Sequence, residues 1–153
     1  LLVSSFCNQV PYAEDQDHWS QEDYWATPYE LLTSNGGDCE DYSIAKYFTL
    51  LRMGVPDEKL RITYVKALKI NQAHMVLAYY PTPDAEPLIL DNLVNQILPA
   101  SQRQDLQPVY SFNGSGLWMS KQRGEGRRIG EASELSKWNM MNQRFLEQLK
   151  EAD

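Results

Sequence analysis

Cys39, His74 and Asp91 are three residue types that together could catalyse acyl transfer, and they follow one another in a suitable chain order. A cysteine thiolate can attack a carbonyl carbon, a histidine can take and return its proton, and a carboxylate can orient that histidine. The chain holds two histidines, and the other, His18, lies in a polar, surface-like stretch. We therefore take Cys39 as the candidate nucleophile, His74 as the base and Asp91 as the orienter of the base.

The sequence around Cys39 predicts the first turn of a helix. Two glycines at 36 and 37 interrupt the chain, and apolar residues then recur at helical spacing from 44 to 51. Asp38 suits the N-cap, and Asp41 three residues later completes an acidic capping box. Unpaired backbone N–H groups and the helix dipole favour a thiolate at this position. The alternative is a buried structural thiol, because free cysteines are among the most buried residues.

His74 and Asp91 lie at the ends of two expected strands. His74 opens the apolar run 73–80, and Asp91 closes the short apolar run 88–91. Each has a plain structural alternative. His74 could be a core histidine with its hydrogen bonds satisfied, and Asp91 could serve only the turn that follows its strand. The helix and strand contexts make the combination more specific than the three residue types alone.

Asp38, Glu40 and Asp41 surround the candidate nucleophile with carboxylates. Acids at a helix start are favoured by the helix dipole, which is the structural interpretation. Three carboxylates in four residues nevertheless repel one another and oppose a neighbouring thiolate. Oxygen-rich clusters suit a hard cation such as calcium, although this spacing is not that of an EF-hand loop. The residues alone therefore leave a calcium site open.

Hydrophobic periodicity and turn residues place the remaining elements. Helical patterns begin at Ser20 and at Pro28, the long nucleophile helix spans 38–53, and an amphipathic helix spans 133–150. Residues 1–18 predict a short helix or an extended lead-in, and the basic, glycine-rich segment 121–130 predicts a mobile loop without a catalytic role. The expected strands are 60–68, 73–80, 88–91, 109–112 and 117–119. Helices first and antiparallel strands afterwards predict an α+β fold.

Length, charge and hydropathy limit the classes of protein that the chain can belong to. The 153 residues suit one domain, 1–153, and 42% hydrophobic with 23% charged residues is typical of a soluble globular protein. A net charge of −7 argues against nucleic-acid binding. No apolar stretch is long enough to insert into a membrane, and Leu1–Val3 is too short for a signal sequence. We therefore expect a soluble chain from which any export signal has been removed.

The second cysteine, Cys7, is expected to be a half-buried free thiol. A disulfide between Cys7 and Cys39 would block the candidate nucleophile, so the two interpretations exclude one another.

Three segments of the chain resemble those of the bacterial transglutaminase-like cysteine proteinases. They are Gly-Asp-Cys-Glu-Asp-Tyr-Ser-Ile-Ala-Lys-Tyr at 37–47, Ala-His-Met-Val-Leu at 73–77 and Leu-Asp-Asn-Leu at 90–93, with support from 21–28. Within that family the chain resembles most the LapG-type periplasmic proteases, which release large surface adhesins from the outer membrane. The resemblance runs from about Trp19 to Pro99 and more weakly to about Trp118.

The resemblance implies a papain/transglutaminase-like fold, in which the nucleophile helix packs on an antiparallel sheet. It implies a calcium-dependent endopeptidase whose metal ligands match Asp38 and Glu40, with Asp41 as a third candidate. The implied substrate is the periplasmic N-terminal region of a surface adhesin, cut at an Ala-Ala site. The implied inhibitor is the periplasmic domain of an inner-membrane cyclic-di-GMP receptor. Cleavage in the periplasm would then promote biofilm dispersal.

Two other classes of function fit the same residues. A transglutaminase would share the three catalytic residues but pass the acyl group to an amine instead of water. A non-catalytic, calcium-dependent binding module would keep the fold but hold an unreactive Cys39.

Overall fold

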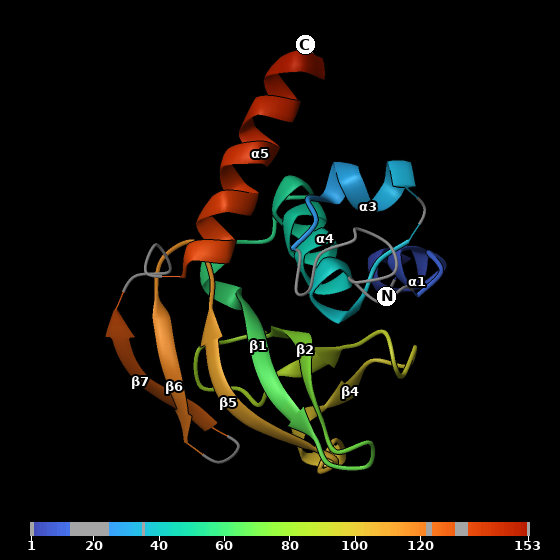
Figure 1. Cartoon of the computed structure of the whole chain (residues 1–153). Coiled ribbons are helices and arrows are strands. Elements are labelled where there is room, and N and C mark those ends of the chain that lie inside the picture. The colour runs from blue at the N-terminus through green and yellow to red at the C-terminus, as the bar shows by residue number, and fades with distance from the viewer. Residues whose placement is uncertain (1, 13–24, 35, 122–123, 131–134, 153) are drawn as a thin grey trace.

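The fold is one antiparallel sheet with helices packed mainly against one of its faces (Figure 1). The computed structural model describes residues 2–12, 25–34, 36–121, 124–130 and 135–152. The helices are α1 (Leu2–Asn8), α3 (Pro28–Ser34), α4 (Cys39–Arg52) and α5 (Ser136–Ala152), with 3-10 turns η1 (Asp57–Lys59) and η2 (Ala100–Gln102). The strands are β1 (Leu60–Ala67), β2 (Gln72–Tyr79), β3 (Leu88–Leu90), β4 (Leu98–Pro99), β5 (Leu106–Phe112), β6 (Leu117–Lys121) and β7 (Gly124–Gly130).

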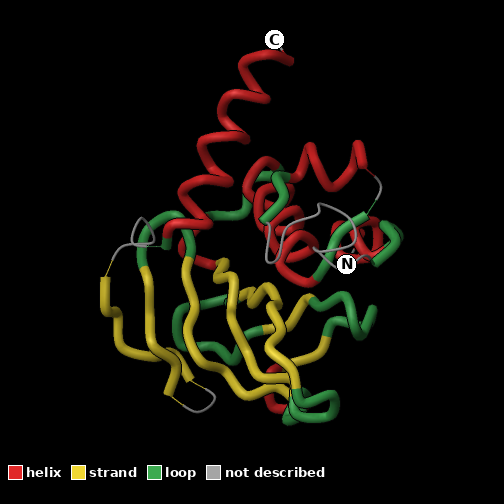
Figure 2. Tube along the Cα trace, in the orientation of Figure 1, coloured by secondary structure: helices red, strands yellow, loops and turns green. Residues whose placement is uncertain are grey.

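The strand order is β4-β3-β2-β1-β5-β6-β7, and every neighbouring pair is antiparallel. Figure 2 shows the helices gathered at one side of this sheet, with α5 starting beside the strands and extending away from them. The sheet carries His74 on β2 and places Asp91 directly after β3, its neighbour. The predicted α+β class, with a nucleophile helix on an antiparallel sheet, is confirmed.

Most of the predicted elements form close to their expected bounds, with two exceptions. The prediction of a mobile loop over 121–130 is wrong, because Gly124–Gly130 form strand β7, whose backbone pairs with β6. Pairing with a neighbouring strand overrides the low strand propensity of glycine and charged residues. The two-residue strand β4 is too short to leave a periodic pattern in the sequence. The helix expected from Ser20, and His18 with it, lie outside the described residues.

The chain is fixed tightly where α4 begins. The Asp41 carboxylate accepts two backbone hydrogen bonds, from the N–H of Asp38 at 3.0 Å and from the N–H of Ala26 at 2.8 Å. The first is the predicted capping-box interaction, and the second ties the helix start to the segment before α3. A Cβ atom on Gly37 would lie 2.4 Å from Leu31 Cδ1, so any side chain there would force the buried Leu31 to shift. The position of Cys39 is therefore set by both local and long-range contacts.

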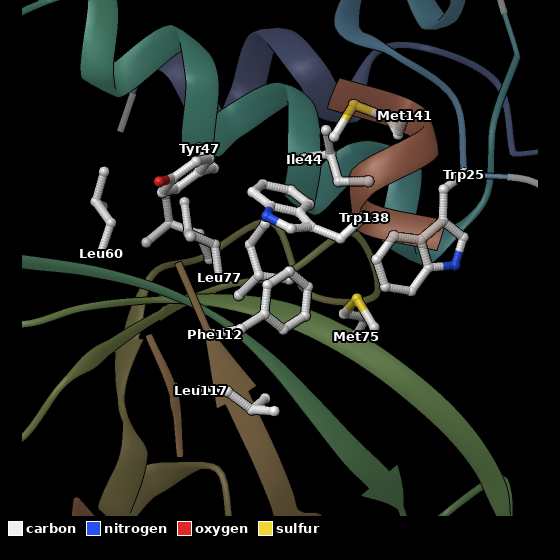
Figure 3. Close-up of a cluster of buried hydrophobic side chains, with 12 residues drawn as sticks. Trp25, Ile44, Tyr47, Leu60, Met75, Leu77, Phe112, Leu117, Trp138 and Met141 are labelled. Atoms are coloured by element: carbon white, nitrogen blue, oxygen red, sulfur yellow. The ribbon is translucent and has the colours of Figure 1, made fainter. Parts of the chain in front are cut away.

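The main hydrophobic core lies between α4, α5 and one face of the sheet (Figure 3). Trp138 of α5 is its central side chain. Its indole ring stacks on Phe48 of α4 with ring centroids 5.7 Å apart, and it meets Phe112 of β5 edge-on at 5.0 Å. Such aromatic pairs add about 0.5–1.5 kcal/mol beyond the area that they bury. They hold α4, through α5, against the sheet that carries the candidate base.

The opposite face of the central strands is buried as well. Its apolar side chains form a second cluster, composed of Val65, Ala67, Val76, Ala78, Ile89 and Leu106. Strand β2 is therefore covered on both faces, which agrees with the central position predicted from its nearly continuous apolar run. Within the part of the chain that the structure describes, no helix is long and apolar enough to cross a membrane.

Asp41→Asn should destabilise the protein, since an asparagine amide can offer only one acceptor oxygen to the two N–H groups of Asp38 and Ala26. An unpaired buried donor costs about 1–3 kcal/mol, and we expect a loss of that order in the free energy of unfolding. Urea denaturation measures it. Asp38→Asn is the matched control and should cost less, because asparagine is an equally good N-cap. Equal stability of Asp41→Asn and the wild type would show that the carboxylate has no such role.

Lys46 on α4 is a buried charge within the core. It is 1% exposed, and its Nζ makes no hydrogen bond with any residue that the structure describes. Burial lowers the pKa of Lys46 from 10.5 to about 8, although the charges of Cys7 and Asp91 act in the opposite direction. Between these two pH values the unfolded chain binds a proton that the folded chain has released. The stability contributed by this site therefore rises with pH from about 8 to 10.5.

Lys46→Met should therefore raise the free energy of unfolding near neutral pH by about 1–3 kcal/mol, because it removes a buried unpaired charge. The advantage over the wild type should shrink as the pH rises, since the wild-type lysine then becomes neutral. Urea denaturation of both proteins at about pH 7 and about pH 9.5 measures the difference. If the two proteins do not differ in free energy of unfolding, or if the difference does not depend on pH, the lowered pKa of Lys46 is contradicted.

Candidate active site

The candidate active site lies where α4 begins beside β2. Cys39 is the first residue of α4, and the backbone N–H of Met75 on β2 acts to lower the pKa of its thiol. The Ser43 hydroxyl, one turn along α4, lies 3.0 Å from the Cys39 carbonyl oxygen and 3.2 Å from that of Met75. These contacts hold the start of α4 against the strand that carries the predicted base.

His74 and Asp91 form a short, buried hydrogen bond. His74 Nε2 lies 2.6 Å from Asp91 Oδ1, and the two residues are 5% and 1% exposed. The antiparallel register of β2 and β3, with Leu77 opposite Leu90, brings the two side chains together. An ionised carboxylate can only accept, so the proton of a neutral imidazole sits on Nε2. Nδ1 is then the basic nitrogen that remains for Cys39.

Asp91 is surrounded by donors. Its Oδ1 also accepts the Leu93 N–H at 3.1 Å, and its Oδ2 accepts Arg103 Nη2 at 2.8 Å. Burial raises the pKa of Asp91, but hydrogen bonds and charge from His74, and the hydrogen bond from Arg103, outweigh it and hold the pKa below its ordinary value. The residue is therefore a carboxylate at neutral pH, as the orienter of a base should be. The Asn8 side-chain amide donates to the Asp91 backbone carbonyl at 2.9 Å.

The Cys39 thiol is held by Glu40 in this structure. Its Sγ donates to Glu40 Oε2 at 3.0 Å, and no hydrogen bond joins it to His74 among the described residues. Burial raises the pKa of Cys39 well above its ordinary value, and the negative charges of Glu40 and Asp38 add to this effect. The Met75 N–H acts in the opposite direction but does not balance them. The expectation that the helix start favours a thiolate is therefore outweighed here by burial and the flanking acids.

Glu40 and Asp41 differ in what their carboxylates already do. Burial raises the pKa of Glu40 to about 8, so this side chain gains from a cation beside it. Both Asp41 oxygens already accept backbone N–H groups, which gives that acid a structural role. The described segments hold no group of three or more His, Cys, Asp or Glu side chains close enough for a metal ion. The carboxylates of Asp38 and Glu40 are thus chemically suited to calcium, although they do not form a complete ligand set with Asp41.

Cys39, His74 and Asp91 were predicted from the sequence, but two residues that contact Asp91 were not. Arg103 was missed because nothing in its local sequence separates it from other arginines. Asn8 was missed because it lies 83 residues from Asp91 and meets it only through the packing of α1. Both thiols are free, which confirms the prediction for Cys7, although it is fully rather than half buried.

Comparison with known proteins identifies the family of the chain. A sequence model of the bacterial transglutaminase-like cysteine proteinases matches residues 2–118. A structure of Legionella pneumophila LapG, EGTA-treated, has a TM-score of 0.83 and 52% sequence identity, and the match covers 94% of this chain and 75% of that one. The calcium-bound LapG structure has a TM-score of 0.81 and 52% identity, with 94% and 77% covered. Among curated proteins the comparison finds no match. The chain belongs to the family of bacterial transglutaminase-like cysteine proteinases.

Proposed function

We propose that the chain is a calcium-dependent cysteine endopeptidase in which Cys39, His74 and Asp91 act as one unit. The observation that carries the proposal is the buried 2.6 Å hydrogen bond between His74 and Asp91, formed beside the helix start that bears Cys39. A carboxylate–imidazole pair next to a cysteine is the arrangement that nucleophilic acyl transfer requires. Membership of a cysteine proteinase family supports the same reaction class.

The reaction begins when His74 Nδ1 takes the proton from the Cys39 thiol. The thiolate attacks the carbonyl carbon of the scissile peptide bond, and the carbonyl oxygen becomes an oxyanion to which the Cys39 backbone N–H can donate. When the tetrahedral intermediate collapses, Nδ1–H passes its proton to the leaving amine and a thioester remains on Cys39. His74 then takes a proton from water, the resulting hydroxide attacks the thioester, and the thiol and a carboxylic acid are released. Asp91 stays ionised and orients the ring throughout.

Calcium is proposed to bind at Asp38 and Glu40, with Asp41 as the third candidate ligand. The support is a calcium-bound structure of the similar protein LapG and the oxygen-rich donor set around Cys39. When bound, the ion would supply positive charge that offsets the acids beside the nucleophile. Glu40 now accepts the thiol hydrogen bond, so its engagement elsewhere would leave the Cys39 sulfur available to His74.

The substrate, the compartment and the partner are proposed from family resemblance. We expect cleavage of the N-terminal region of a large surface adhesin at an Ala-Ala site, in the periplasm, with promotion of biofilm dispersal. We also expect the periplasmic domain of an inner-membrane cyclic-di-GMP receptor to bind and inhibit the protease. The segments at 37–47, 73–77 and 90–93 and the similarity to LapG support these proposals.

Alanine at Cys39, His74 or Asp91 should abolish most cleavage of such an adhesin fragment without unfolding the protein. Residues that act as a unit are not additive, so Cys39→Ala and the double variant with His74→Ala should both lose at least about a thousandfold. Mass spectrometry of the products measures the reaction and separates the alternatives. New peptide termini indicate hydrolysis, an amine joined to a glutamine side chain indicates a transglutaminase, and no product indicates a binding module. Near-wild-type turnover by a folded His74→Ala would refute the catalytic assignment.

Calcium should bind the protein directly and raise its melting temperature, since the proposed ligands are present in the folded state and absent as a set in the unfolded chain. Asp38→Asn and Glu40→Gln should each weaken binding, measured by calorimetry, because each removes one ligand charge. Asp84→Asn, which removes an exposed acid in the turn after β2, is the matched control. A chelator should slow cleavage. If the ion changes neither melting temperature nor cleavage, the acids serve only the helix start.

A further inference from the structure

Arg103 is a buried cation that bridges the active-site carboxylate to a second acid. It caps the 3-10 turn η2 and is 4% exposed. Its Nη2 donates to Asp91 Oδ2 at 2.8 Å, while Nε and Nη2 form a two-pronged contact of 3.1 Å each with Asp105. The guanidinium plane is therefore set by Asp105, and one of its N–H groups points at Asp91.

Asp105, which orients this guanidinium, is itself hydrogen-bonded to the sheet. The Asp105 backbone carbonyl accepts the N–H of Leu68, just beyond the end of β1, at 2.7 Å. The Arg103 backbone N–H donates to Ala100 at the start of η2 at 3.0 Å. The planar guanidinium of an arginine held by two hydrogen bonds has a better defined orientation than the flexible ammonium of a lysine would have. The position of the Arg103 N–H that meets Asp91 is thus determined by the fold.

The contacts of Asp91 leave no freedom for its carboxylate. Oδ1 accepts from His74 and from the Leu93 N–H, and Oδ2 accepts from Arg103. Without Arg103, a carboxylate oxygen buried away from water would lose its donor, and the group could regain one only by rotating. Rotation would break the bond from Oδ1 to His74 Nε2, which fixes the tautomer of the ring.

Asp91, Arg103 and Asp105 together carry one negative charge, because the two acids exceed the one cation. A positive charge on His74 during the reaction would neutralise the sum of these three charges. Arg103 alone would compensate Asp91 fully, and Asp105 restores the negative charge that the imidazolium needs.

We propose that Arg103 is a positioning residue of the active site, which holds Asp91 so that Oδ1 meets His74 Nε2 and Nδ1 stays unprotonated. The proposal rests on the proposed catalytic role of Cys39, His74 and Asp91. It assigns to the segment after η2 a function in catalysis, although Arg103 touches neither nucleophile nor base.

The test compares Arg103→Gln and Arg103→Lys with the wild type in two measurements on the full chain. Nitrogen NMR of labelled histidine reports which ring nitrogen of His74 carries the proton, and it requires no substrate. Arg103→Gln should lose the single Nε2-protonated form. Cleavage kinetics should show kcat lowered by about a hundredfold, the cost of a misplaced catalytic group, with KM nearly unchanged. Arg103→Lys should retain part of the Nε2-protonated His74 signal and part of kcat, since lysine keeps the positive charge but lacks the planar guanidinium.

Arg61→Gln is the matched control. Arg61 is also a buried arginine, 6% exposed, and lines the same cavity as Arg103. Its guanidinium lies 3.8 Å from the ring centroid of Trp118, whereas the guanidinium that donates to Asp91 Oδ2 is that of Arg103. This variant can lower stability, measured by urea denaturation, but should leave kcat and the His74 signal unchanged. It therefore separates the loss of a buried arginine from the loss of the Asp91 contact.

Two results would overturn the role of Arg103. One is a wild-type His74 signal in Arg103→Gln, and the other is a kcat equal to that of Arg61→Gln. Where Arg103→Gln does not fold, Arg103→Lys decides, because a purely structural salt bridge predicts wild-type kcat and NMR signal in the folded lysine variant. If the wild type cleaves nothing, the proposed function fails, while the NMR comparison still supports or refutes the positioning of His74 by Arg103.

Discussion

The buried hydrogen bond between His74 and Asp91 is the interaction on which the rest of the site depends. A carboxylate removed from water must be given donors, because an isolated buried charge costs several kcal/mol. This chain supplies them from three directions: a strand neighbour, the following turn and a remote arginine. The register between β2 and β3, the loop after η2 and the packing of α1 all converge on this one residue.

At Cys39, the candidate nucleophile, opposing effects act on the pKa of the thiol. The helix start and the Met75 N–H favour a thiolate, whereas burial and the acids beside Cys39 favour the thiol. The second group of effects is larger, so Cys39 is a thiol that donates its hydrogen bond to Glu40. A base alone deprotonates such a cysteine poorly, because the pKa of the thiol is raised. A change of charge at the flanking acids is therefore the natural point at which activity could be controlled, and calcium is the proposed agent of that change.

Much of the site could be predicted because its signals are local. The start of α4 follows from the capping interaction between Asp38 and Asp41, which lie three residues apart. The central position of β2 follows from its nearly continuous apolar run, since a strand covered on both faces has no polar side. Cys39, His74 and Asp91 could be selected because few residue types perform nucleophilic acyl transfer. In each case the physical cause lies within a short stretch of chain or within one residue's chemistry.

Other features were decided only by tertiary structure. Arg103 meets Asp91, and Asn8 meets it from the other end of the chain, through packing that no local pattern encodes. The glycine-rich basic segment becomes β7 because β6 offers it a free edge. Asp41 and Glu40 are nearly equivalent in the sequence, yet one binds two backbone N–H groups and the other the nucleophile. The sequence by itself determined which groups could do the chemistry and which helix and strands would carry them. The tertiary structure decided which partners orient these groups and shift their pKa values, because those contacts form only between segments that folding brings together.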